Sequence, residues 1–99
     1  MKFGLMYEIQ IPEPHYPGIE QERYKQVLAQ AELADQVGFD YFWTVEHHFL
    51  NEFSHCSAPE VLYGAISQIT KRIRIGHAVA LLPSQYNHPV RVAERAAVL

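Results

Sequence analysis

An acid and two histidines stand side by side where a run of bulky apolar residues gives way to polar ones. The run occupies residues 41–45, and Glu46, His47 and His48 follow it directly. Carboxylate and imidazole groups bind metal ions, and histidine exchanges protons near neutral pH. This segment is therefore the first candidate for chemistry in the chain.

Three interpretations of residues 46–48 compete. A metal site would join His47 and His48 to His55 in the same loop. Adjacent residues of an extended strand point to opposite faces, however, and the spacing HExxH, which puts two histidines on one helical face, is absent. The segment can also be a solvated loop with incidental histidines, or it can hold a histidine poised for proton transfer. Spacing alone leaves these alternatives open.

Three short apolar stretches predict the β-strands of this chain. They are rich in aromatic and β-branched residues and lie at 2–7, 40–45 and 73–82. Helical spacing follows each of them, so the predicted order β-α-β-α-β-α implies right-handed units and a parallel α/β sheet. Because the carboxyl ends of parallel strands meet at one edge, the residues following each stretch are expected to converge there.

The predicted helices carry recognisable start and stop signals. The first begins at Glu20 and is expected to stop at Gly38. The second has a capping box, with Ser57 as the N-cap and Glu60 at the third helical position. The third follows Pro89 and runs to Leu99 without a cap, and three strands alone would leave two apolar sheet edges open. We therefore expect a piece of a larger α/β protein; a complete βα barrel has about 250 residues.

Composition excludes several classes of function. The net charge of −3, without a lysine or arginine cluster, offers no surface for nucleic acid, and the apolar runs are too short to span a membrane. Cys56 is the only cysteine, so no disulfide is expected and a cytoplasmic location is favoured. An inert loop thiol is expected there, and His77 is expected to be a structural histidine facing a barrel interior. No common nucleotide-binding or hydrolase motif occurs.

Several segments together resemble the luciferase-like flavin-dependent monooxygenase family, in the order of its first three βα units. They are MKFGLM at 1–6, GFDYFWTVEHHF at 38–49, IRIGHAVALLP at 73–83 and HPVRVAERAAVL at 88–99. The resemblance implies a (β/α)8 TIM barrel, with residues 1–99 forming the N-terminal part of a single domain. It also implies an enzyme that oxygenates a small organic substrate with reduced FMN and O2. A flavin reductase would supply the reduced FMN, and the full-length enzyme would be a homodimer. A deazaflavin F420-dependent oxidoreductase and a non-catalytic subunit or truncated product are the alternatives.

The resemblance also implies roles for particular residues. His47 matches the acid/base beside the flavin, and Glu46 and His48 match its neighbours lining the pocket. Met6 matches a first-strand position beside the ring. Ala78–Val79 matches a bulge that often holds a non-proline cis peptide under the ring. The groups that hold the flavin phosphate lie in later parts of the family's chains, so residues 1–99 alone are expected to bind flavin poorly and to be inactive.

Overall fold

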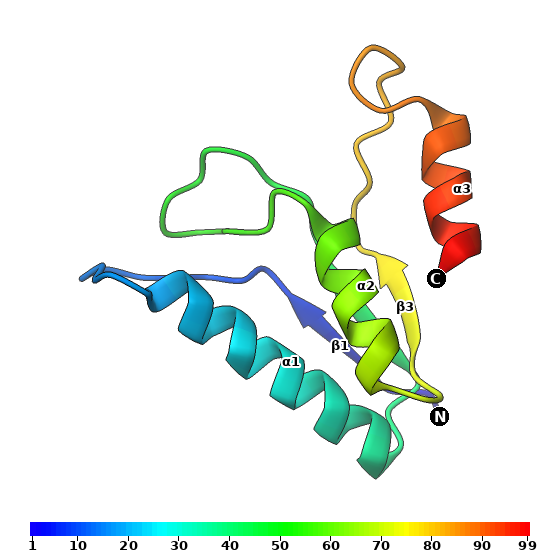
Figure 1. Cartoon of the computed structure of the whole chain (residues 1–99), viewed down its shortest axis with the longest axis horizontal. Helices are drawn as coiled ribbons and strands as arrows, with labels where there is room; N and C mark the ends of the chain where they lie inside the picture. The colour runs from blue at the N-terminus through cyan, green and yellow to red at the C-terminus, as the bar shows by residue number, and fades with distance from the viewer.

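The computed structural model describes all 99 residues. Along the chain, β-strands and α-helices alternate strictly (Figure 1). The elements are β1 (Gly4–Tyr7), α1 (Ile19–Val37), β2 (Tyr41–Thr44), α2 (Pro59–Ile69), β3 (Arg74–His77) and α3 (Pro89–Val98). β2 lies between β1 and β3, and both pairings are parallel. The predicted α/β class with a parallel sheet is confirmed.

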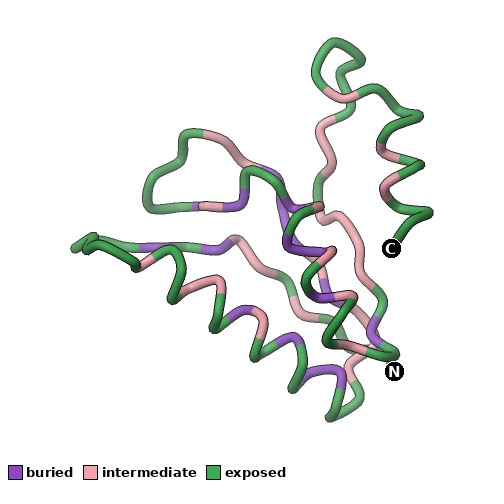
Figure 2. Tube along the Cα trace, viewed as in Figure 1, coloured by how far each residue is buried: buried purple, intermediate pink, exposed green.

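The strand register divides the side chains between two faces of the sheet. Leu5 is paired with Phe42, and Tyr7 with Thr44, and these residues face the core beneath α1 and α2. Most of the buried positions lie there (Figure 2). Met6, Trp43 and Gly76 are register partners on the opposite face, where Met6 is 60% exposed.

Trp43 covers the opposite face because its two neighbouring strands carry glycine there. A Cβ atom added to Gly76 would lie 2.3 Å from Cζ3 of Trp43, and one added to Gly4 would lie 3.2 Å from its Nε1. The first distance is far inside van der Waals contact, so no side chain fits at position 76 while the indole keeps its place. The two glycines therefore allow one large ring to lie across the three strands.

Asp35 fastens the end of α1 to the start of β3. Its Oδ2 accepts a hydrogen bond from the backbone N–H of Lys71 at 2.8 Å, and its Oδ1 accepts from Arg72 at 2.9 Å and Ile73 at 2.7 Å. Burial raises the pKa of this carboxyl, but the three backbone donors and the Arg72 charge outweigh it and hold the pKa below its usual value. The ionised carboxylate is thus part of the folded structure.

Several element boundaries shift by one or two residues from the sequence-based prediction, and two features, the end of β3 and the cap of α2, differ more. β3 ends at His77 and not at Leu82, because its partner β2 ends at Thr44, whose carbonyl accepts the last bond from the N–H of Ala78 at 2.9 Å. The capping box at Ser57 is wrong: Ala58 is the N-cap of α2, without a side-chain cap. Pro59 instead occupies the first helical position, where a missing N–H costs little.

The expected position of His77 in a barrel interior is also wrong. His77 shares the helix-covered face with its register partner Thr44. Its ring contacts Tyr63 of α2 edge-on, with 4.9 Å between the ring centroids, and its Nδ1 is buried without a hydrogen-bond partner. A structural contact between sheet and helix is therefore its observed role.

The helix α3 stands away from the rest of the molecule (Figure 1). It has no buried residue. Arg95 Nη1 anchors it, at 3.4 Å from Glu60 Oε1 of α2 and 3.2 Å from Asn87 Oδ1. None of the three helices combines the length and apolarity that a membrane span requires.

Candidate functional site

The carboxyl ends of the three strands meet at one edge of the sheet. The parallel ladder continues just beyond them, because the N–H of Val45 donates to the carbonyl of Tyr7 at 3.4 Å and that of Ala78 donates to Thr44 at 2.9 Å. Glu8, the 46–48 segment and Val79 therefore leave the sheet on the same side. This is the convergence that the sequence predicts.

Backbone hydrogen bonds hold the loop after β2 against the segment after β1. The N–H of His55 donates to the carbonyl of Ile9 at 3.0 Å, and the hydroxyl of Tyr24 donates to the carbonyl of His55 at 2.7 Å. Within the loop, the N–H of His47 donates to Cys56 at 2.9 Å. Ile9 adopts a left-handed φ of 54°, which is strained for a β-branched residue. The backbone that carries Glu8 and His47 is thus fixed from several sides.

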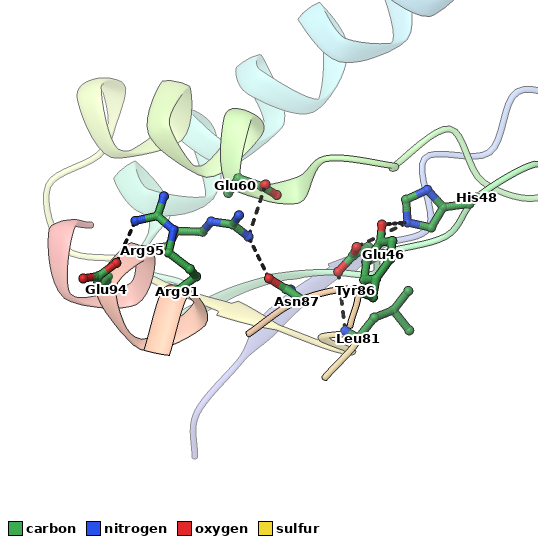
Figure 3. Close-up of polar contacts among 9 residues, drawn as sticks. All are labelled: Glu46, His48, Glu60, Leu81, Tyr86, Asn87, Arg91, Glu94 and Arg95. Carbon is green, nitrogen blue, oxygen red and sulfur yellow. Dashed lines mark hydrogen bonds and ion pairs between the residues drawn. The ribbon is translucent and has the colours of Figure 1, made fainter. Parts of the chain in front are cut away.

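Glu46 and His48 belong to a polar network that also includes the loop after β3 (Figure 3). The Nε2 atom of His48 lies 3.2 Å from Glu46 Oε1 and 2.6 Å from the hydroxyl oxygen of Tyr86. The other carboxylate oxygen of Glu46 accepts the backbone N–H of Leu81 at 3.4 Å. Glu46 is 7% exposed, so a buried acid organises this side of the site.

His47 points to a different carboxylate. Its Nε2 lies 3.6 Å from Glu8 Oε2, an oxygen that is buried and has no hydrogen-bond partner. The imidazole ring also faces Phe53, with 5.8 Å between the ring centroids. The two adjacent histidines therefore have separate acids, Glu8 for His47 and Glu46 for His48. A carboxylate beside an imidazole orients its ring, as proton transfer requires.

The histidines do not assemble a metal site. No group of three or more histidine, cysteine or acidic side chains lies close enough to hold a metal ion. His47 and His55 line the same small cavity, but His48 turns away toward Tyr86. His47, His48 and His55 thus do not form one cluster in this structure.

Cys56 is buried beside the strand ends as a neutral thiol. Burial, and to a lesser extent the charges of Glu46, Glu60 and Glu8, raise the pKa of this thiol. Its sulfur lies 3.3 Å from the Thr44 hydroxyl, which lowers the pKa without reversing the shift. Since the thiolate is the nucleophilic form, Cys56 is not an activated nucleophile.

Comparison with known proteins identifies the family. The family model of luciferase-like monooxygenases matches residues 1–99. The chain belongs to the luciferase-like monooxygenase family. A relative within it, 4-hydroxyprotoasukamycin monooxygenase of Streptomyces nodosus subsp. asukaensis, is 40% identical over 72 residues, which cover 73% of this chain and 19% of that protein.

Solved structures of monooxygenases have the same arrangement of elements. The monooxygenase RslO1 from Streptomyces bottropensis matches with a TM-score of 0.79 and 31% identity, over 99% of this chain and 29% of that one. The oxygenating constituent of 3,6-diketocamphane monooxygenase from Pseudomonas putida, in complex with FMN, matches with a TM-score of 0.78 and 26% identity, over 96% and 25%. The chain thus spans between about a fifth and three tenths of the length of these relatives.

The remaining residues expected from this luciferase-like family lie near the strand ends, with one difference. Met6 is exposed beside Trp43, Val79 is 45% exposed, and Ala78 packs against the core. The bond between Ala78 and Val79 is trans, since the only cis peptide bond in the chain precedes Pro14. The expected cis peptide is therefore wrong, and the bond has the trans form that a non-proline residue ordinarily takes.

Two further residues of the site have partners that only the structure shows. Glu8 directly follows β1, and this position at a strand end already predicts that it lies at the converging edge. Tyr86 lies in the loop before α3, nine residues beyond the end of β3, and nothing in its sequence context indicates a contact with His48. Only the fold brings Tyr86 to His48.

Proposed function

We propose that residues 1–99 are the first three βα units of a (β/α)8 barrel that oxygenates a small organic substrate with reduced FMN and O2. The observation that carries this proposal is the match to the luciferase-like monooxygenase family over residues 1–99. One structural neighbour was solved in complex with FMN. The convergence of Glu8, the 46–48 segment and Val79 at one sheet edge is consistent with a site there.

The sheet itself supports a larger barrel. β1 and β3 are both edge strands, so each has one side without a neighbouring strand. Parallel sheets are almost always covered on both faces, and soluble proteins avoid exposed apolar edges. Five further βα units would pair both edges and enclose the face that Trp43 occupies.

The strand ends suit the isoalloxazine ring of a flavin. Met6 and Val79 expose apolar surface that a flat ring would cover. Glu8 Oε2 is a buried acceptor without a hydrogen-bond donor, and the ring carries an N–H group. In this proposal Met6, Ala78 and Val79 contact the ring, while Glu46 and His48 line its rim. The proposal assigns no residue of 1–99 to binding the FMN phosphate.

His47 is proposed to be the acid/base of the site. Bound reduced FMN supplies the electrons that activate O2. His47 holds or accepts a proton at one nitrogen of its imidazole. Glu8 orients this imidazole through its Nε2 atom. Phe53 lies beside the same imidazole, with 5.8 Å between the ring centroids, and covers one side of it.

The test uses the full-length protein with reduced FMN, O2 and a panel of small organic substrates. His47→Ala is expected to lower turnover by about 10²- to 10⁴-fold, the usual contribution of a general acid or base. His15→Ala is the matched control, because His15 also pairs with a glutamate, at 3.3 Å, and is similarly exposed. Full activity of His47→Ala would remove His47 from the mechanism. Hydride exchange with deazaflavin F420 in place of oxygenation would replace the proposed reaction.

A further inference from the structure

One ring nitrogen of His48 meets two oxygen atoms at once. Its Nε2 lies 3.2 Å from Glu46 Oε1 and 2.6 Å from the Tyr86 hydroxyl oxygen, whereas Nδ1 points away from both (Figure 3). The three side chains come from two different segments, the one after β2 and the loop before α3. A neutral imidazole has one N–H donor and one acceptor nitrogen, so the position of its proton decides what it can do.

Glu46 determines where that proton lies. An ionised carboxylate only accepts hydrogen bonds, and its Oε2 already accepts the N–H of Leu81. If Nε2 of His48 lacked a proton, its lone pair would face Oε1 of this buried acid at 3.2 Å, with no hydrogen between them. Such an unsatisfied contact is costly because Glu46 is buried. The proton therefore belongs on Nε2.

Tyr86 is compatible with this assignment. Partial desolvation and the nearby carboxylates of Glu46 and Glu60 raise the pKa of its phenol, so Tyr86 keeps its proton at neutral pH. Its hydroxyl oxygen, 2.6 Å from Nε2 of His48, can accept Nε2–H while the phenol keeps its own proton. In this arrangement Nε2–H of His48 is the donor, and the oxygens of Glu46 and Tyr86 are the acceptors.

We propose that Glu46 and Tyr86 are positioning residues that fix His48 in the tautomer protonated at Nε2, which leaves Nδ1 as the nitrogen offered to a ligand. The tautomer itself does not depend on the proposed oxygenase activity. Only the use of Nδ1 by a bound ligand rests on that function. Tyr86 also ties the loop before α3 to the strand ends, so the histidine is held from two sides.

The direct test is the nitrogen spectrum of the imidazole rings in the full-length, ¹⁵N-labelled protein. The measurement is made over a rising pH series and read where the nitrogen shifts no longer change with pH, so that the neutral ring is observed. His48→Gln assigns the signals by their disappearance. We expect Nε2 in the range of a protonated nitrogen and Nδ1 in the range of a free one. The reverse pattern would overturn the proposal without any need for a positioning variant.

Two variants separate the roles of the positioning residues. In Glu46→Gln the Leu81 N–H retains the amide oxygen, so the amide N–H₂ faces Nε2 and the proton is expected to shift to Nδ1. In Tyr86→Phe the tautomer is expected to persist, with loss of the Nε2 proton signal through faster exchange with water. Tyr16→Phe is the control, because the Tyr16 hydroxyl also makes an exposed side-chain hydrogen bond, to Glu22 at 2.8 Å, but lies far from His48 in the chain.

The outcomes distinguish this proposal from the proposed function. An unchanged spectrum in Glu46→Gln overturns the role of Glu46, and a retained proton signal in Tyr86→Phe overturns that of Tyr86. Turnover with FMN is measured separately on the same preparations. The predicted tautomer in a protein without flavin-dependent turnover would support the positioning network and contradict the oxygenase.

Discussion

Asp35 and Glu46 are the two buried carboxylates of this chain, and they are used in different ways. Asp35 accepts only backbone N–H groups and joins two elements. Glu46 accepts one backbone N–H group and also contacts His48, which can change its protonation. A carboxylate held by fixed donors serves folding, whereas one that contacts a titratable ring serves a site. We therefore expect mutations of the two acids to affect different measurements.

Asp35→Asn is expected to lower the free energy of unfolding of the full-length protein by about 2 kcal/mol, because hydrogen bonds to a charged acceptor are lost. Asp40→Asn is the control, since Asp40 accepts one exposed backbone bond, from Phe3 at 2.9 Å, and should cost less. The folded-state pKa of Asp35 is lowered, so its stabilisation is present above the ordinary value of about 3.9 and disappears as the pH falls through the folded value. Urea unfolding at a series of pH values measures this, and a difference between Asp35→Asn and wild type that does not shrink below about pH 4 would contradict the assignment.

At the scale of elements, the packing of the sheet depends on which strand positions lack a side chain. Trp43 on the central strand lies across β3 at Gly76 and against β1 at Gly4. Parallel register puts all three residues on the same face, so a large ring on one strand needs small neighbours on the next. The aromatic run at 41–43 therefore places Phe42 in the core and Trp43 on the opposite face.

Gly76→Ala is expected to destabilise the protein by about 1–3 kcal/mol, the usual range for overpacking, because the new methyl group overlaps the Trp43 ring. Gly64→Ala is the matched control: Gly64 lies inside α2, and an added Cβ meets no atom within 4 Å. That control should stabilise the helix by about 0.5–1 kcal/mol. Thermal unfolding and tryptophan fluorescence report both effects. Equal stability of the two variants would show that the indole does not cover Gly76.

At the scale of the whole molecule, residues 1–99 leave much apolar surface uncovered. Both edges of the sheet are unpaired, and α3 buries nothing. Large apolar side chains are exposed on the strands, the helices and the loops between them, including Met6, Leu33, Val37, Val61, Val79, Val90 and Val98. Surface of this extent is typical of a part that associates with further structure.

Residues 1–99 expressed alone are expected to self-associate and to bind FMN at least about 100-fold more weakly than the full-length protein, a loss of about 2.7 kcal/mol. The reason is that neither the exposed edges nor the flavin phosphate has a partner within this segment. Light scattering measures the association, and flavin fluorescence measures the affinity. A monomer that binds FMN as tightly as the full-length protein would contradict the proposed division of the site.

The sequence by itself determined the order of the elements, the parallel sheet and the place of the candidate site. Strand and helix periodicities are local signals, and parallel topology makes consecutive strand ends converge, so Glu46, His47 and His48 could be located without coordinates. The resemblance to the luciferase-like family was confirmed. The roles given to His47, Met6 and the other site residues stay predictions.

Only the tertiary structure decided which partners the site residues have. Tyr86 lies 38 residues from His48 along the chain, and Glu8 lies 39 residues from His47, yet each pair is in contact. The end of β3 likewise depends on a partner distant in sequence, because Ala78 donates the last bond to Thr44 of β2. Periodicity fixes which way an element faces, but contacts between loops arise from the packing of the elements that carry them. For that reason the adjacent histidines, equivalent in the sequence, differ in the fold by the acid each one meets.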